Sequence, residues 1–209
     1  MTNTDREILL TIIIPHYNSP FLLNKLIASI PMSKEIQIII VDDNSTKECE
    51  ELSNVMENNC HCEFYVNDSG VQSAGACRNI GLKHAKGEWV LFSDADDYFL
   101  DDFYDVIRQY MDGSPDIVFF VPTSIDLATK EESVRHVFYK GLIMNYLENP
   151  SIESEIQLRY QYFSPCSKII RRKMICENEI FFDEVMWSND VMFSIKTGYL
   201  AKTIQACEQ

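Results

Sequence analysis

Runs of consecutive apolar residues along the first 121 positions predict strands that are buried inside the protein. Residues 8–14 (ILLTIII) and 36–41 (IQIIIV) are rich in β-branched side chains and show no polar face. Such continuous runs are typical of strands covered on both sides of a sheet. Three further runs have the same character, at residues 62–66, 88–93 and 116–121. The pattern therefore predicts five strands in this part of the chain.

Between these strands, apolar positions recur at helical spacing over residues 21–30, 47–57, 72–86 and 101–111. Ser45 or Thr46 is suited to cap the second of these helices, and Gly87 to end the third in a left-handed conformation. Strand and helix thus alternate four times. This order predicts an α/β fold, a Rossmann-like and mostly parallel sheet with helices on both faces.

Polar side chains follow the predicted strands where each strand ends. A single Asp after a strand is usually a turn former or a helix cap. Four such clusters at one edge of a sheet instead favour a nucleotide-type site, because ligands bind beyond the carboxyl ends of parallel strands. The clusters are His16 to Asn18, Asp42 with Asp43, Asn67 with Asp68, and Asp94 to Asp97.

The pattern is less regular after residue 122. Helices are predicted over residues 139–148, 154–162 and 189–201, among scattered aromatic positions. No Pro-, Gly- or Ser-rich linker separates this region from the first half. We therefore expect one domain with two halves, residues 1–122 and 123–209.

Composition narrows the class of partner. The 209 residues carry a net charge of −14, with 46% hydrophobic and 24% charged residues. This charge argues against nucleic acid as a partner and against a broad basic membrane-binding face.

The chain shows neither a signal-peptide pattern nor an apolar run approaching the ~20 residues of a membrane span. Seven cysteines form no CxxC pair, and Cys60-His61-Cys62 lacks a second half for a zinc site. Reduced thiols in a cytoplasmic protein are expected.

Asp94-Ala95-Asp96, directly after the strand WVLF, is the strongest chemical signal. Alternate residues leaving a strand point in related directions, so both carboxylates can share one ligand set. Carboxylate oxygens suit Mg²⁺ or Mn²⁺, and magnesium sites commonly combine one or two carboxylates with substrate phosphates. The alternative is an Asp-rich helix N-terminus, which suits Asp97, Asp101 and Asp102 better.

Four segments carry a resemblance to a known family. They read TIIIPHYN, IIIVDDNST, GACRNIGLKHAKGEWVLFSDADD and CSKIIRRKMI…FFDEVMWSNDVMF. In this order and spacing the chain resembles a family 2 glycosyltransferase of the GT-A fold, from about residue 8 to residue 200. The stretch from Gly75 to Asp97 is the most diagnostic.

The resemblance implies a role for each matching residue on the donor side. Pro15, Tyr17 and Asn18 would line the base and ribose pocket of a nucleotide-sugar, with Tyr17 near the base. Asp43, together with Asp42 as a second candidate, would accept a hydrogen bond from a uracil ring.

The resemblance also implies a phosphate, metal and acid–base set. Arg78 would approach the diphosphate, Asp94 would contact ribose or sugar, and Asp96 would bind the metal. Asp190 matches the catalytic base, which in many relatives follows a Glu. Here the pair is Asn189-Asp190, so the support of the base differs from that pattern.

Several of these residues also have structural interpretations. Arg78 could be a surface residue of its helix, and Asp190 could cap a helix. Trp187 suits either packing or the floor of a sugar site, and Lys168 either a family position or an exposed lysine. His16 is interpreted as a loop residue without a role.

The implied reaction is a direct displacement with inversion at the anomeric carbon. The donor would be a UDP-sugar and the acceptor a glycan or lipid-linked glycan in cell-surface polysaccharide synthesis. We expect the first half to bind the donor and residues 123–209 to form an acceptor half that is truncated at its C-terminus. The predicted location is the cytoplasm, with peripheral association at the inner face of the membrane as a further option.

Three alternatives remain open. A non-catalytic nucleotide-sugar binding protein would differ only in the fate of Asp190. A receiver-type signalling domain would explain Asp42-Asp43, but its acidic pair follows the first strand rather than the second. A sugar nucleotidyltransferase would need a Gly-rich, basic loop after the first strand, which is absent from this sequence.

Overall fold

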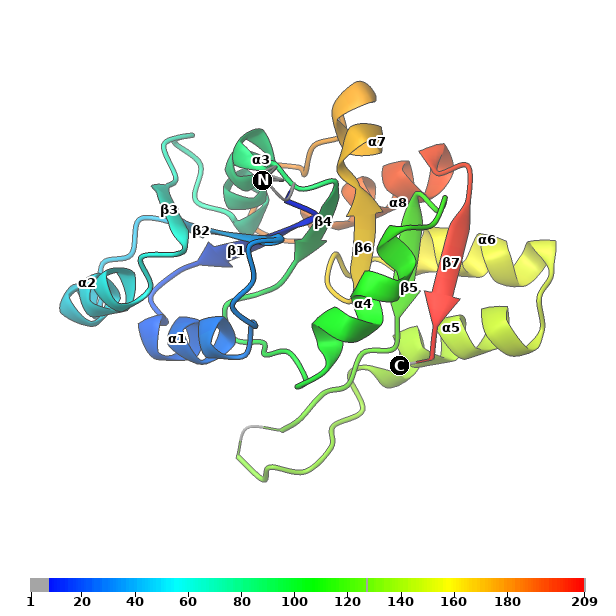
Figure 1. Ribbon diagram of the computed structural model, residues 1–209, viewed down its shortest axis with the longest axis horizontal. Helices are drawn as coiled ribbons and strands as arrows, with labels where there is room; N and C mark the ends of the chain where they lie inside the picture. The colour runs from blue at the N-terminus through cyan, green and yellow to red at the C-terminus, as the bar shows by residue number, and fades with distance from the viewer. Residues whose placement is uncertain (1–7, 127, 209) are drawn as a thin grey trace, which may run out of the picture.

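The computed structural model describes residues 8–126 and 128–208, and these form a sheet with helices on both faces (Figure 1). The strands are β1 (Leu10–His16), β2 (Ile36–Asp42), β3 (Glu63–Val66), β4 (Trp89–Phe92), β5 (Ile117–Phe120), β6 (Lys168–Arg171) and β7 (Ile204–Cys207). The helices are α1 (Pro20–Ala28), α2 (Cys49–Asn58), α3 (Ala74–His84), α4 (Phe103–Met111), α5 (Val137–Glu148), α6 (Ile152–Gln161), α7 (Arg172–Glu177) and α8 (Val191–Leu200).

The strands form a single seven-stranded sheet in the order β3-β2-β1-β4-β6-β5-β7. Strands β1 to β4 are mutually parallel, with β1 between β2 and β4. Strand β6 pairs antiparallel with both β4 and β5, and β7 pairs parallel with β5. The predicted α/β fold with a mostly parallel sheet is confirmed, and both halves of the chain contribute strands to it.

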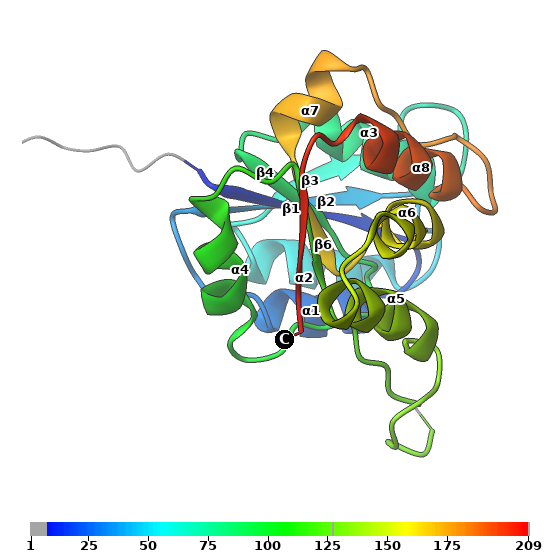
Figure 2. The same cartoon turned by 90° about the vertical axis from the view of Figure 1, so that its right-hand side faces the viewer.

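Alternate strand residues supply two separate apolar cores. Leu10, Ile12 and Ile14 of β1 pack on the face covered by α1, α2 and α4. Ile13 and Phe92 point to the opposite face, against α5, α6, α7 and α8. Figure 2 shows this layering, with α4 on one side of the sheet and α5, α6 and α8 on the other. Burial on both sides explains why these strands read as uninterrupted apolar runs.

Two predicted helix ends were wrong. Helix α2 begins at Cys49 after the left-handed residue Glu48, without a side-chain cap, so neither Ser45 nor Thr46 caps it. Helix α3 ends at His84, and Gly87 does not adopt a positive φ angle. Glycine is required at position 87 for another reason, since a Cβ there would lie 2.6 Å from the backbone nitrogen of Thr11.

The pattern also missed β6, α7 and β7. Their apolar stretches are short, and in β6 the two central isoleucines are flanked by Lys168 and Arg171. The places of β6 and β7 in the sheet depend on pairing with β4 and β5, which are far away in the sequence. Long-range pairing of this kind cannot be read from local periodicity.

Candidate active site

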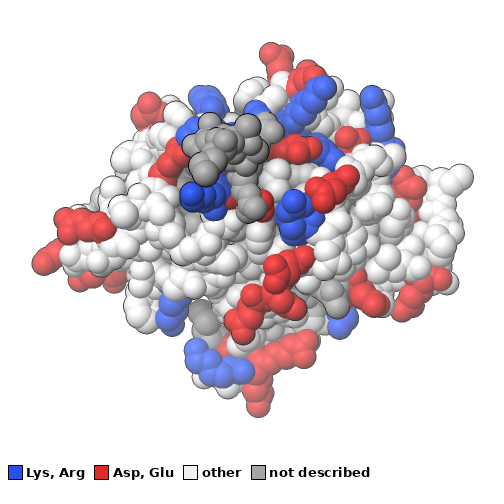
Figure 3. Space-filling model, viewed as in Figure 1, with Lys and Arg blue, Asp and Glu red and all other residues white. Residues whose placement is uncertain are grey.

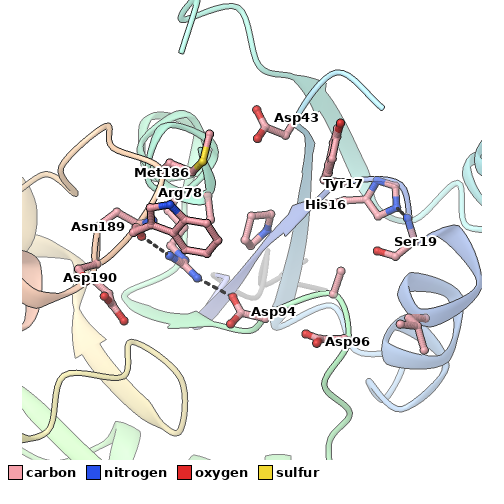
Figure 4. Close-up of a pocket in the computed structure, with 16 residues that line it drawn as sticks. His16, Tyr17, Ser19, Asp43, Arg78, Asp94, Asp96, Met186, Asn189 and Asp190 are labelled. Atoms are coloured by element: carbon pink, nitrogen blue, oxygen red, sulfur yellow. Dashed lines mark hydrogen bonds and ion pairs between the residues drawn. The ribbon is translucent and has the colours of Figure 1, made fainter. Parts of the chain in front are cut away.

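An open cavity of about 540 Å³ lies at the carboxyl ends of β1, β2 and β4, next to the N-terminus of α8. Figure 4 shows Asp190, Asn189 and Met186 on one wall and Tyr17, His16 and Ser19 on the opposite wall, with Asp94 and Asp96 between them. Of the nine site residues predicted from the sequence, seven line this cavity: Pro15, Tyr17, Asp43, Arg78, Asp94, Asp96 and Asp190. The structure thus brings residues from both halves of the chain into one space.

Asn18 and Asp42, the other two predicted residues, do not line the cavity. Asn18 adopts a left-handed conformation, and its side-chain oxygen accepts hydrogen bonds from the backbone of Thr46 and Lys47. Asp42 accepts hydrogen bonds from the backbone and hydroxyl groups of Ser45. Both residues hold the loops after β1 and β2 together and thereby position the wall that Tyr17 and Asp43 present.

His16, interpreted from the sequence as a residue without a role, is buried and connects two loops. Its Nε2 accepts a hydrogen bond from the backbone of Ser19 at 3.1 Å, so the proton must reside on Nδ1. Nδ1 lies 2.8 Å from a carboxylate oxygen of Asp42. This chain of contacts fixes the segment between β1 and α1, from which Tyr17 extends half-exposed into the cavity.

Asp43 is buried at the end of β2 and has a defined partner. Asn67, which follows β3, donates a hydrogen bond from its side-chain amide to the Asp43 carboxylate at 2.5 Å. Burial and the nearby Asp43 charge raise the pKa of the Cys77 thiol in α3. Cys77 is therefore an unreactive core residue, whereas Asp43 keeps acceptor capacity toward the cavity.

One face of α3 holds the segment that leads to Asp190. A side chain at Gly75 would overlap the backbone carbonyl of Asp183, so only glycine permits this close approach. Asn79 exchanges hydrogen bonds with the backbone of Phe182, at 2.9 and 3.0 Å. Spacings of three and four residues place these positions and Arg78 on neighbouring faces of the helix.

Arg78 is buried and joins the two walls of the cavity. One guanidinium nitrogen donates to the side-chain oxygen of Asn189 at 2.8 Å, and another pairs with the Asp94 carboxylate at 2.5 Å (Figure 4). The interpretation of Arg78 as a surface residue is therefore wrong. Asn189, which sequence reasoning treated as a lost Glu, supplies a neutral acceptor in this pair of contacts.

The acidic cluster after β4 offers ligands for a divalent cation. Within the described residues, one ligand atom each of Asp94, Asp97 and Cys166 lies within 4.8 Å of the others. Asp97 is exposed, but desolvation of its carboxyl group by the surrounding residues, together with the charges of Asp94 and Asp96, raises the pKa of Asp97 to about 6. Asp96, the predicted metal ligand, lines the cavity outside this group of three. Carboxylate oxygens fit Mg²⁺ or Mn²⁺. Burial and the charges of Asp94 and Asp97 raise the pKa of the Cys166 thiol, so its protonated sulfur is a weaker ligand than the carboxylates.

Asp97 does not belong to a helix N-terminus, because α4 begins six residues later at Phe103. Its position beside Asp94 and Cys166 could not be anticipated, since Cys166 comes from the far end of the sequence and precedes the missed strand β6. The cluster thus combines residues from both halves of the chain.

Asp190 occupies the N-cap position of α8 but makes no capping hydrogen bond. The capping interpretation of this residue is therefore wrong. Its half-buried carboxylate faces the cavity from the wall opposite Tyr17 (Figure 4). A carboxylate in this position is free to accept a proton from a bound molecule.

Lys168 lies beneath this wall and is fully buried. Its ammonium group donates to the carbonyl of Tyr162 at 3.2 Å and to the hydroxyl of Ser194, in the first turn of α8, at 3.1 Å. Burial lowers the pKa of Lys168 to about 7, partly offset by the charges of Cys166 and Asp190. The interpretation as an exposed lysine is wrong.

Solved structures of several glycosyltransferases have a fold similar to that of this chain. Crystal structures of TarS from Staphylococcus aureus in complex with UDP and with UDP-GlcNAc match with TM-scores of 0.74 and 0.71. They share 22% and 21% sequence identity, over 96% of this chain and 58% and 56% of theirs. The mannosyltransferase PcManGT from Pyrobaculum calidifontis, in complex with GDP-Man and Mn²⁺, matches with a TM-score of 0.68 at 18% identity, over 99% of this chain and 56% of that chain. The fold is that of the GT-A glycosyltransferases.

The sequence comparison then gives the family. The family model described as "Glycosyl transferase family 2" matches residues 11–177, and the chain belongs to this family. Poly(ribitol-phosphate) beta-N-acetylglucosaminyltransferase TarS from S. aureus is 24% identical over 200 residues, which cover 93% of this chain and 33% of that protein. GalNAc(5)-diNAcBac-PP-undecaprenol beta-1,3-glucosyltransferase from Campylobacter jejuni is 28% identical over 206 residues, covering 94% and 63%. The chain thus spans between one third and two thirds of the length of these relatives.

Proposed function

We propose that this chain carries the catalytic site of an inverting glycosyltransferase, which moves a sugar from a UDP-sugar to an acceptor hydroxyl. One observation carries the proposal. Asp190 makes no capping bond and faces, across a single cavity, the strand-end residues Asp43, Asp94 and Asp96. A general base on one wall, with nucleotide-binding groups on the other, is what a direct displacement requires.

The donor side follows from the walls formed by β1, β2 and β4. Tyr17 is half-exposed and offers a ring against which a nucleobase can stack, and buried Asp43 offers an acceptor for its N–H group. UDP as the nucleotide is supported by the uracil-type acceptor at Asp43 and by the UDP complexes of TarS. Asn18 and Asp42 act by holding these loops in place.

The acidic cluster supports a requirement for Mg²⁺ or Mn²⁺. Asp94 and Asp97, with Asp96 at the cavity edge, are the residues that would hold the cation, and Cys166 is a third member of the cluster. When bound, the cation would offset the charge that develops on the leaving diphosphate. Four lining carboxylates face one arginine in this cavity, so a diphosphate needs such compensation.

On the acceptor side, Asp190 takes the proton from the attacking hydroxyl. Because Asp190 lies across the cavity from the donor-binding groups, the hydroxyl attacks the anomeric carbon from the face opposite the diphosphate, and the configuration inverts. Arg78 and Asn189 fix the segment before Asp190, so that the carboxylate is held rather than mobile.

Cell-surface glycan synthesis is the process to which we assign the reaction, because the named relatives in S. aureus and C. jejuni act on poly(ribitol-phosphate) and on an undecaprenol-linked glycan. We assign donor binding mainly to residues 1–122 and acceptor binding mainly to residues 123–209.

Among the described residues, none of the helices has the length and apolar character that a membrane span needs. Figure 3 shows Lys and Arg side chains scattered among Asp and Glu on the face in view, without a broad basic surface for nucleic acid.

The deciding experiment compares the wild type with Asp190→Asn. UDP affinity is measured by calorimetry with and without Mn²⁺, transfer by release of UDP, and the anomer of the product by NMR. Since Asp190 makes no capping bond, the variant should keep its fold and its UDP affinity. Transfer should fall by about 10²–10⁴-fold, the usual contribution of a general base.

Three outcomes would contradict the proposal. Unchanged transfer in Asp190→Asn would move the base to another carboxylate. A product with retained configuration would reject the displacement. Metal-dependent binding of UDP without any transfer would favour the non-catalytic binding protein.

A further inference from the structure

The cavity wall next to Asp190 carries exposed apolar side chains that the proposed reaction does not use. Met186 and Trp187 both line the cavity, and 66% and 80% of their surfaces are exposed. The Trp187 ring makes no ring contact or hydrogen bond with any described residue. A packing role for Trp187 is therefore wrong, and its ring is available to a ligand.

The backbone turns sharply at this point and presents Trp187 outward. Ser188 adopts a left-handed conformation with φ 56°, which non-glycine residues adopt only where the surroundings impose it. On its far side, Asn189 points inward and is held by Arg78 at 2.8 Å. The same segment thus fixes Asp190 on the cavity wall and exposes the indole three residues earlier.

The negative charge around Met186 and Trp187 favours a neutral ligand over an anionic one. Residues 181–190 contain Asp183, Glu184 and Asp190 and no Lys or Arg. The one arginine that lines the cavity is buried and pairs with Asp94. A phosphorylated acyclic polyol would meet carboxylates with no cation to receive its phosphates, and it has no flat face to cover an indole. A neutral sugar ring buries the apolar C–H face of its ring on an aromatic surface and leaves its hydroxyls free.

We propose that Met186 and Trp187 form the acceptor subsite and that it takes a neutral pyranose ring, stacked on Trp187 with a hydroxyl toward Asp190. This inference rests on the proposed function and specifies its acceptor class. It excludes a polyanionic polyol-phosphate chain as the group held at this wall. A lipid surface is the competing occupant, and the acidic residues beside Trp187 oppose it on an anionic membrane.

Fluorescence gives a direct test, because the chain has only two tryptophans and Trp89 is fully buried. Quenching by iodide therefore reports on Trp187. With UDP and Mn²⁺ present, a panel of neutral methyl pyranosides and short neutral oligosaccharides should protect Trp187 from iodide, whereas ribitol 5-phosphate should not. Protection by ribitol 5-phosphate alone, or by no member of the panel, would overturn the inference. A blue shift on vesicles of phosphatidylglycerol, without protection by pyranosides, would overturn it in favour of a lipid surface.

Kinetics gives a second and independent test with matched variants. Trp187→Ala should raise the KM for a neutral pyranoside acceptor at least about tenfold, equivalent to about 1.4 kcal/mol. UDP affinity should not fall to a comparable extent, and Trp187→Phe should restore most of the acceptor affinity. Tyr199→Ala is the control, since Tyr199 is a comparably exposed aromatic on α8 that does not line the cavity.

The two proposals fail in different ways. If the wild type binds UDP with Mn²⁺ but Trp187→Ala keeps the acceptor KM, the subsite is wrong and the transferase assignment stands. If the wild type neither binds UDP nor hydrolyses a UDP-sugar, the proposed function is wrong and the subsite fails with it.

Discussion

Lys168→Met tests whether a buried ammonium group beneath the cavity wall that carries Asp190 sets the pH dependence of stability. Lys168 is fully buried, and burial lowers its pKa from 10.5 to about 7. Methionine has a similar length and an apolar end, so the variant removes the titrating group while leaving the space filled. Its hydrogen bonds to Tyr162 and Ser194 are lost with it.

The sign of the effect follows from the protons bound in each state. Between pH 7 and pH 10.5, Lys168 is protonated in the unfolded chain and increasingly neutral in the folded protein. The unfolded state therefore binds more protons, and stability rises with pH across this window. A pKa that falls from 10.5 to about 7 on folding corresponds to a stability difference of about 5 kcal/mol between the two ends of this window. Lys168→Met should lack this contribution.

The assay is urea unfolding of both proteins at several pH values from 7 to 10, read as the difference in the free energy of unfolding. Titration of tyrosines and cysteines is common to both proteins and cancels in that difference. Wild-type stability should rise relative to Lys168→Met by several kcal/mol over the window. Lys173→Met, at an exposed lysine on α7, should show no such relative change. Parallel curves for the wild type and Lys168→Met would refute the reasoning.

Two further predictions concern residues next to those that line the cavity. Gly75→Ala should destabilise the protein by about 1–3 kcal/mol in urea unfolding, because its methyl group would overlap the carbonyl of Asp183. Gly141→Ala, where a methyl group meets nothing within 4 Å in helix α5, should instead stabilise by about 0.5–1 kcal/mol, and equal effects of the two changes would contradict the close packing of α3. Mn²⁺ affinity measured by calorimetry should fall as the pH drops through about 6, because protonation of Asp97 competes with the metal. Asp97→Asn should bind Mn²⁺ more weakly and without that step near pH 6, and an unchanged step would assign the proton to another group.

Much of the first half of the chain could be predicted because its central strands are buried on both faces. Ile12 and Ile13 face opposite cores, so the run that contains them carries no polar position and identifies a central strand. Parallel order then brings the strand ends together, which is why Asp43 and Asp94 were correctly expected at one edge. Strands that are buried on both faces can therefore be predicted from the sequence alone.

The remaining parts depend on contacts that no local pattern encodes. Asp42 and Asp43 are adjacent and chemically identical, yet one bonds His16 and Ser45 and the other lines the cavity. Lys168 is a buried lysine, and lysines are almost never fully buried, so exposure was the natural expectation. Cys166 reaches Asp97 only because β6 inserts between β4 and β5.

Arg78 shows why the two walls of the cavity must be considered together. Its guanidinium already holds the Asp94 carboxylate and the Asn189 side chain, while its Nε has no partner among the described residues. With a Glu at position 189, as the family pattern has it, Arg78 would contact two carboxylates. Their two negative charges would exceed the single positive charge of the guanidinium group. Asn189 keeps the acceptor oxygen without the charge, so its contact with Arg78 adds no negative charge to a cavity that Asp94 and Asp190 already make acidic. Under the proposed function, Asn189 would therefore keep the segment before Asp190 in place and leave Arg78 more of its positive charge for a bound diphosphate.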